Sequence, residues 1–285
     1  MLAMTKKIVR RLLEIRVLAV QRQKRALRKL DKAPCDTARL STDIDQHRLK
    51  EIFSSQDIGR EWPAVEQVIA ELRITEKAGG VNPGDRRAIY YLLRALRPRL
   101  ILEVGTHIGA STVHAAAALR ANQSEDPGNS YRLTTVDVVD VNDPRSKPWI
   151  RHGSTFSPRD MITRVGAASD VAFVTASSLN YLSSCGDQRY DFVFLDGDHS
   201  ATAVYQEVAM ASRALNQGGV ILLHDYFPRL RPLWSDGSVI QGPWLATQRL
   251  KTEGTRIEVL PLGQLPWETK LNSHATSLAL LVGAK

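Results

Sequence analysis

The chain of 285 residues contains only two cysteines, Cys35 and Cys185, and neither belongs to a CxxC pair or a Cys/His cluster. This scarcity argues against a disulfide framework and a structural zinc site, and it favours a reducing compartment. No apolar run reaches the roughly 20 residues that a membrane-spanning helix needs, and the N-terminus lacks the apolar core and cleavage site of a signal peptide. We therefore expect a soluble, cytoplasmic protein.

Basic charge is scarce outside one end of the chain. The net charge is +8, but residues 1–32 hold eleven Lys or Arg against two acidic residues, a net of +9, which leaves 8 minus 9, or about −1, for residues 33–285. A basic groove for nucleic acid is therefore not expected on the globular part. An anionic partner would instead meet the N-terminal segment.

That basic segment has the pattern of an amphipathic helix. Between Lys6 and Leu30, apolar residues recur at helical spacing among Lys and Arg, which predicts a helical arm over residues 1–36. Two uses of the arm stay open. It packs on its own body or on a second subunit of a homo-oligomer, or residues 1–32 attach the protein to an anionic membrane surface or partner.

Residues 37–84 are predicted to form a helical cap or linker, and residues 85–285 a further domain. Asp85 is the expected N-cap of a helix that runs to about Leu96 and ends before Pro98. Short apolar runs then alternate with helical segments, which predicts a parallel sheet covered on both faces. We expect strands near 100–104, 132–136, 171–175, 191–195, 219–223, 256–261 and 277–282, and helices near 109–121, 158–168 and 200–215.

These elements predict an α/β fold with a Rossmann-like, doubly wound sheet of seven strands. The last two strands are joined by a short connection that contains Gly and Pro, which indicates an antiparallel pair at the end of the sheet. The sheet is therefore expected to be mostly parallel, with one antiparallel strand. Ligands bind such sheets at the carboxyl ends of the strands.

A glycine turn follows the first strand, in the segment Leu100-Ile-Leu-Glu-Val-Gly-Thr-His-Ile-Gly-Ala-Ser111. Gly105 would let the backbone approach a ligand, and Gly109 would let the next helix begin close by, with Ser111 or Thr112 as its cap. The spacing is not GxGxxG, which disfavours a nicotinamide-dependent oxidoreductase. Glu103 would repel a pyrophosphate but can accept hydrogen bonds from a cationic amino-acid group.

The next two strands end in residues suited to a nucleoside. Asp137 closes one strand and can accept hydrogen bonds from both hydroxyls of a ribose. The other strand ends in small residues, where an adenine ring could lie beside Ser177 or Ser178. Three successive strand ends that carry a glycine turn, an acid and a small polar residue indicate a nucleoside site more specifically than any one of them.

Together with Tyr190-Asp-Phe-Val-Phe-Leu-Asp-Gly-Asp-His199 and Gly218-Gly-Val-Ile-Leu-Leu-His-Asp225, this turn resembles the class I S-adenosylmethionine-dependent methyltransferases, and in particular the methyltransferase domain 24 family. The resemblance covers roughly residues 85–285. It implies O-methylation of a small-molecule hydroxyl, such as a sugar, a phenol or a related natural product. The implied cofactor is S-adenosylmethionine, with the binding residues Glu103, Gly105, Thr106, Gly109, Ser111, Asp137, Ser177 and Asp196.

The same resemblance implies a divalent metal ion, such as Mg or Mn, held by Asp196, His224 and Asp225. A bound cation lowers the pKa of a hydroxyl and orients it toward the sulfonium methyl. His224 departs from the family pattern, which has an acid there, and imidazole shifts the metal preference from magnesium toward manganese, iron or zinc. The alternative is a metal-free His224 that bonds to a neighbouring strand end.

The resemblance also implies a catalytic base just after the first metal ligand. Asp198 matches the base of sugar methyltransferases, and His199 stands where catechol-type enzymes carry a lysine, so either could take the proton. Substrate recognition is expected from the segment before Gly84 and from the loops over 138–157 and 226–244, which contain Trp and Arg. Two other functions remain as alternatives: an NAD(P)-dependent oxidoreductase, and a non-catalytic cofactor-binding protein docked through its basic arm.

Overall fold

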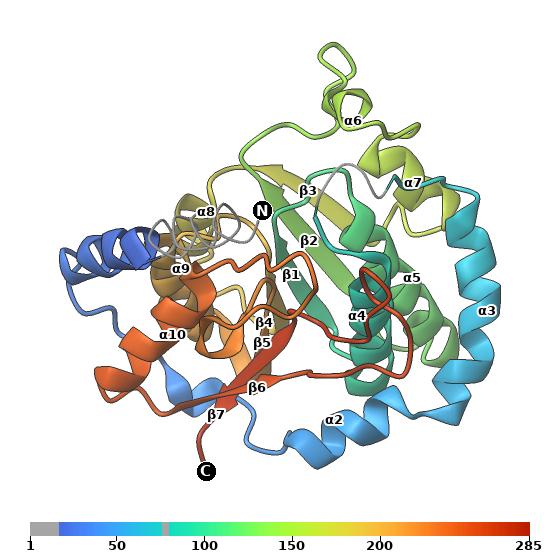
Figure 1. Ribbon diagram of the computed structural model, residues 1–285. Coiled ribbons are helices and arrows are strands. Elements are labelled where there is room, and N and C mark those ends of the chain that lie inside the picture. The colour runs from blue at the N-terminus through green and yellow to red at the C-terminus, as the bar shows by residue number, and fades with distance from the viewer. Residues whose placement is uncertain (1–16, 76–79) are drawn as a thin grey trace, which may run out of the picture.

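The computed structural model describes residues 17–75 and 80–285. Its centre is a seven-stranded sheet in the order β3-β2-β1-β4-β5-β7-β6 (Figure 1). The strands are β1 (Leu100–Val104), β2 (Arg132–Asp137), β3 (Val171–Thr175), β4 (Tyr190–Leu195), β5 (Leu215–Leu223), β6 (Ile257–Pro261) and β7 (Ala279–Gly283). The predicted Rossmann-like fold is confirmed.

Strand pairing also follows the prediction. β1 runs parallel to both β2 and β4, while β7 runs antiparallel to both β5 and β6. β7 is therefore the one antiparallel strand, and it lies between β5 and β6 rather than at the edge. The strand order reverses between β1 and β4, which is where ligands bind in doubly wound sheets.

Helices cover both faces of the sheet (Figure 1). One face carries α2 (Gln46–Phe53), α3 (Gln56–Ala70), α4 (Pro83–Leu96), α5 (Ala110–Glu125) and α7 (Pro158–Arg164). The other carries α8 (Ser178–Ser184), α9 (Ala201–Arg213) and α10 (Gly242–Thr252). Separate apolar cores fill the two faces, because a strand covered on both sides packs side chains on both of its faces. Short helices α6 (Pro148–Arg151), η1 (Thr37–Arg39) and η2 (Pro228–Leu230) lie in the connections.

The N-cap of α4 corrects one prediction. Asp85 does not cap this helix; Asn82 does, and its side-chain oxygen accepts the Asp85 backbone N–H at 3.0 Å. Pro83 explains the shift, since proline holds the preceding residue in an extended conformation and is favoured at the first helical position. Asp85 therefore lies inside the first turn, where it is fully buried.

Other boundaries also differ from the expectation. α7 ends at Arg164 and α9 at Arg213, earlier than predicted, because Gly166 has φ +73° and β5 begins at Leu215. α8 has no counterpart among the predicted helices, and α10 begins inside the predicted loop over 226–244. Within 37–84, α2 and α3 contribute to the same apolar core as α4.

Residues 17–28 of the predicted N-terminal helix are helical, and residues 1–16 lie outside the described part. This helix lies beside α9 and α10 (Figure 1). Leu27 is only 4% exposed and belongs to the core on that face, and the Arg249 side chain donates hydrogen bonds to the carbonyl oxygens of Leu27 and Leu30. The predicted domain boundaries at residues 36 and 84 stay predictions. None of the described helices has the length and apolarity of a membrane span.

Candidate functional site

The turn after β1 requires glycine at two positions. Gly105 has φ +96° and Gly109 φ +78°, a region that side chains with a Cβ rarely adopt. A Cβ at Gly105 would also lie 2.2 Å from the carbonyl oxygen of Asp196. The turn therefore runs directly against the segment that follows β4, and it brings the ends of these two neighbouring strands into contact.

Glu103 lies beneath this turn and is 2% exposed. Its carboxylate accepts hydrogen bonds from the hydroxyls of Ser111 and Thr112, each at 2.6 Å, and of Thr135 at 2.7 Å. Burial raises the pKa of Glu103 to about 7, although these hydrogen bonds lower it. The prediction that Ser111 or Thr112 caps α5 is wrong, because Gly109 occupies the cap position and both hydroxyls point to Glu103 instead.

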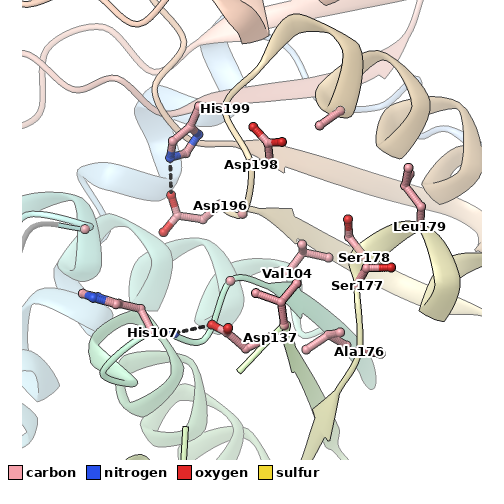
Figure 2. Close-up of a pocket in the computed structure, with 16 residues that line it drawn as sticks. Val104, His107, Asp137, Ala176, Ser177, Ser178, Leu179, Asp196, Asp198 and His199 are labelled. Atoms are coloured by element: carbon pink, nitrogen blue, oxygen red, sulfur yellow. Dashed lines mark hydrogen bonds and ion pairs between the residues drawn. The ribbon is translucent and has the colours of Figure 1, made fainter. Parts of the chain in front are cut away.

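A cavity of about 640 Å³ opens above the turn, at the carboxyl ends of β1, β2, β3 and β4 (Figure 2). Seven of the predicted site residues line it, namely Gly105, Asp137, Ser177, Ser178, Asp196, Asp198 and His199. His107, which belongs to the glycine turn, lines it too. Glu103, Thr106, Gly109 and Ser111 are not part of the cavity wall and lie in or below the turn.

Asp137 is held in place at one end of the cavity. One carboxylate oxygen accepts the His107 backbone N–H at 2.9 Å, and the other accepts that of Val139 at 3.0 Å. Figure 2 shows Asp137 near the ends of β1 and β2, apart from Asp196 and His199. These two hydrogen bonds fix the carboxylate while leaving each oxygen a second lone pair for a ligand.

Ser177 and Ser178 form the wall next to β3. Ser177 caps α8 by accepting the Asn180 N–H, and the Ser178 hydroxyl donates to the carboxylate of Glu207 on α9. Glu207 is 1% exposed, and burial raises its pKa to about 7, with Asp198 adding to the rise and the Ser178 hydrogen bond opposing it. Sequence reasoning missed Glu207; the only signal was an acid on the apolar face of a predicted helix.

Acidic and imidazole side chains meet at the other end of the cavity. Ligand atoms of Asp196, His199 and His224 all lie within 4.8 Å of one another. The carboxylate of Asp225 lies 3.4 Å from His199 Nε2 and 3.6 Å from His224 Nδ1. The three predicted metal ligands are thus brought together. His199, predicted only as a base, belongs to the same cluster, and Figure 2 shows its ring directed at Asp196.

The donor atoms of this cluster fit a divalent cation. His224 Nδ1 and Asp196 Oδ1 lie 2.6 Å apart, yet they are not aligned as a hydrogen bond, and among the described residues Nδ1 has no other hydrogen-bond partner. Burial lowers the pKa of His224, but Asp196 and Asp225 outweigh that effect and raise it well above its usual value. Buried oxygen and nitrogen ligands that converge in a strongly negative potential are what manganese, iron or zinc prefer.

A second cavity, of about 680 Å³, lies on the far side of this cluster. Its wall includes His224 and Asp225, and Gly80 borders both cavities. Lys270 lies over the ring of Trp234, with Nζ 4.7 Å from the ring centroid, and pairs with Asp236 at 3.2 Å. The acidic and imidazole cluster therefore stands between two spaces, one beside Asp137 and one beside Trp234.

Comparison with known proteins finds a similarity to one family in the central part of the chain. Residues 102–226 match the family model described as "Methyltransferase domain". A "Putative O-methyltransferase" of Mycobacterium sp. (strain JLS) is 29% identical over 148 residues, which cover 52% of this chain and 57% of that protein. One of strain KMS is 26% identical over 161 residues, which cover 56% and 64%. The chain thus matches less than two thirds of the length of these curated relatives.

Solved structures share the fold. A "putative O-methyltransferase from Klebsiella pneumoniae" matches with a TM-score of 0.52 at 17% identity, over 87% of this chain and 99% of that one. The O-methyltransferase TomG from Streptomyces achromogenes, solved in complex with SAM, matches with a TM-score of 0.51 at 17% identity, over 85% and 100%. At this identity the likeness establishes the architecture, and the function has to be argued from the site.

Proposed function

We propose that this chain, whose residues 102–226 match a methyltransferase family model, transfers the methyl group of S-adenosylmethionine to a hydroxyl oxygen of a small molecule. One observation carries the proposal: a single cavity has a fixed carboxylate, Asp137, at one end and Asp196 and His199, which cluster with His224, at the other. A nucleoside held by its ribose at the first end would direct its sulfonium group toward the second.

Each part of the cavity suits one part of this cofactor. Asp137 would accept hydrogen bonds from the two ribose hydroxyls, and Ser177 would lie beside the adenine ring. Gly105 would let the ligand approach the backbone, while Glu103 and Thr106 would stiffen the turn through their hydrogen bonds to Thr135. Gly109 and Ser111 would act through the same turn. The side chains that hold the cofactor would thus be fixed before it binds.

The cluster would hold a divalent metal ion through Asp196, His224 and Asp225. The ion, when bound, would lower the pKa of the acceptor hydroxyl and orient it. Asp198 or His199 would accept the proton. One carboxylate oxygen of Asp198 already accepts the Ser200 backbone N–H at 2.8 Å, and His199 Nε2 faces the carboxylates of Asp196 and Asp225. The acceptor, a sugar, a phenol or a related compound, would enter through the second cavity and lie near Trp234.

Three wider properties belong to the same proposal: a cytoplasmic protein, assembled as a homo-oligomer, with its N-terminal segment near an anionic surface. In the described part of that segment, one surface pocket is lined by residues that include Leu18, Arg22, Arg25 and Lys29. Leu18 is 64% exposed. An apolar residue beside three cations suits the headgroup region of an anionic membrane.

Replacement of Asp196 tests the proposed chemistry. The D196A variant removes a ligand of the metal but leaves the ribose carboxylate in place, so methyl transfer should fall to background while affinity for S-adenosylmethionine stays nearly unchanged. Transfer is measured from methyl-tritiated S-adenosylmethionine to a panel of catechols and glycosides, and affinity by calorimetry. The exposed Asp187, replaced by Ala, serves as control. Loss of binding in parallel with loss of transfer would contradict the assignment.

A further inference from the structure

Asp85 is a buried carboxylate that takes no part in the proposed methyl transfer. It lies in the first turn of α4, outside the matched residues 102–226, and its exposure is 0%. One oxygen, Oδ2, accepts a hydrogen bond from the Asn82 side-chain N–H at 2.8 Å. The other, Oδ1, has no hydrogen-bond partner among the residues that the structure describes. A buried carboxylate with an unused oxygen is costly, so its presence calls for a function.

The neighbour that Asp85 faces is His224. Asp85 Oδ2 lies 3.7 Å from His224 Nε2, on the opposite side of the imidazole from the cluster. Nδ1 of the same ring lies 2.6 Å from Asp196 Oδ1 and 3.6 Å from Asp225 Oδ2. The imidazole therefore stands between two sets of carboxylates, with one nitrogen directed to each.

A metal-bound imidazole uses one nitrogen as ligand and carries its proton on the other. Histidine ligands usually donate that second N–H to a carboxylate or a carbonyl, which fixes the tautomer and the ring orientation. His224 and Asp85 have this relation, with Nδ1 toward the cluster and Nε2 toward a carboxylate. A movement of about 0.8 Å would shorten their 3.7 Å separation to a normal hydrogen bond.

We propose that Asp85 is a positioning residue for the metal centre: it accepts the Nε2–H of His224 and so presents the Nδ1 lone pair to the cation. This inference rests on the proposed metal site. It assigns to α4, and not only to the methyltransferase domain, a part in building that site. It also gives His224 a reason to stand in place of an acid, because a carboxylate ligand has no N–H to donate to Asp85.

A purely structural role for Asp85 is available, and a second helix provides the comparison. Asp160 occupies the same position in α7: Pro158 begins the helix, the Ser157 hydroxyl oxygen accepts the Asp160 backbone N–H, and the Asp160 carboxylate accepts the Ser157 backbone N–H. Asp160 is exposed on the surface and is not part of the cluster or of either cavity wall. Replacement of Asp160 by Asn therefore removes a negative charge from the same helix position without touching the cluster.

The test is a calorimetric titration of MnCl2 into the full chain saturated with S-adenosylhomocysteine, for wild type, D85N and D160N. We expect D85N to bind Mn²⁺ 10- to 100-fold more weakly, the usual effect of losing such an outer partner, and D160N to bind it as wild type does. The proposal is overturned if D85N binds Mn²⁺ as tightly as wild type. It is also overturned if D160N loses as much Mn²⁺ affinity as D85N does. No Mn²⁺ binding by wild type overturns it too. The heat of S-adenosylhomocysteine binding, measured first, reports separately on the proposed function.

A measurement on the unmutated protein keeps the inference testable even where D85N does not fold. With zinc bound to the ¹⁵N-histidine-labelled protein, NMR should show that His224 carries its proton on Nε2. Its Nδ1 should carry no proton. A capping role for Asp85 does not require that tautomer. A proton on Nδ1 with Nε2 at the metal contradicts the proposal directly.

Discussion

At the scale of single residues, two buried glutamates support the cavity from below. Glu103 and Glu207 are each at most 2% exposed, and burial raises the pKa of each to about 7. Their hydrogen-bond partners are hydroxyls, not cations. Each carboxyl therefore exchanges its proton near neutral pH, where an exposed glutamate would be fully charged. Because the charged form is costly in a buried position, the stability of the site depends on pH.

Glu207 gives a prediction with a definite sign. Its pKa is about 7 in the folded protein and 4.5 as the ordinary value, so its contribution to stability is complete below pH 4.5 and is lost as the pH rises through 7. The difference of 2.5 units corresponds to about 3 kcal/mol. The E207Q variant, which keeps the acceptor for Ser178, should therefore gain stability relative to wild type on going from pH 5 to pH 8, measured by urea unfolding. The exposed Glu66, replaced by Gln, should show no such gain, and a gain of equal size there would refute the burial argument.

Residues at strand ends could be predicted from sequence, and those on helices could not. Asp137 and Asp196 follow apolar runs, and the carboxyl ends of parallel strands share one edge, so the sequence pattern alone predicts that they lie at one edge of the sheet. Asp85 and Glu207 lie inside helices, where an acid usually faces solvent. Only the tertiary packing of α4 and α9 against the sheet shows that both point inward.

At the scale of elements, the cluster depends on how α10 meets the connection between β4 and α9. A Cβ at Gly242, the first residue of α10, would lie 1.9 Å from the carbonyl oxygen of His199 and 2.8 Å from the Ala201 nitrogen. Gly242 therefore allows the helix to approach the backbone that carries Asp198 and His199. The sequence predicts a loop in this region, because a helix that starts Gly-Pro-Trp has no polar N-cap signal.

Replacement of Gly242 by Ala should displace that backbone. Overpacking of this kind costs about 1–3 kcal/mol of unfolding free energy, and the shift of the segment that begins at Asp196 should also weaken Mn²⁺ binding. Denaturant unfolding and a MnCl2 titration measure the two effects. Gly128 has no atom within 4 Å of its added Cβ, so G128A is the matched control. Wild-type stability in G242A would show that the close approach is not a constraint.

At the scale of the whole molecule, the N-terminal helix is part of the folded body as far as it is described. Leu27 is 4% exposed and Leu18 is 64% exposed, although both lie on the helical residues 17–28. The periodicity of the sequence predicts the helix but leaves open whether it packs on the body or meets a partner, because an amphipathic pattern does not name the surface that covers it. Contacts with α9 and α10 account for one face, and the basic face stays available for the proposed anionic surface.

A pair of leucine variants measures that packing. L27A should lower the free energy of unfolding by about 2–5 kcal/mol through lost burial and a residual cavity, whereas L18A should change it by no more than about 0.5 kcal/mol. Thermal and urea unfolding give both values. Equal stability of the two variants would mean that the helix does not belong to the folded body.

The central claim is that the cavity at the ends of β1 to β3 binds S-adenosylmethionine through Asp137, and calorimetry with S-adenosylhomocysteine tests it most directly. Wild type should bind one equivalent, and D137A should bind about 100-fold more weakly, since two charge-assisted hydrogen bonds to the ribose are worth about 3 kcal/mol. Asp140, whose carboxylate accepts the Asn142 N–H much as Asp137 accepts that of Val139, gives the control D140A, expected to bind as wild type does. No binding by wild type, or unchanged affinity in D137A, would contradict the account.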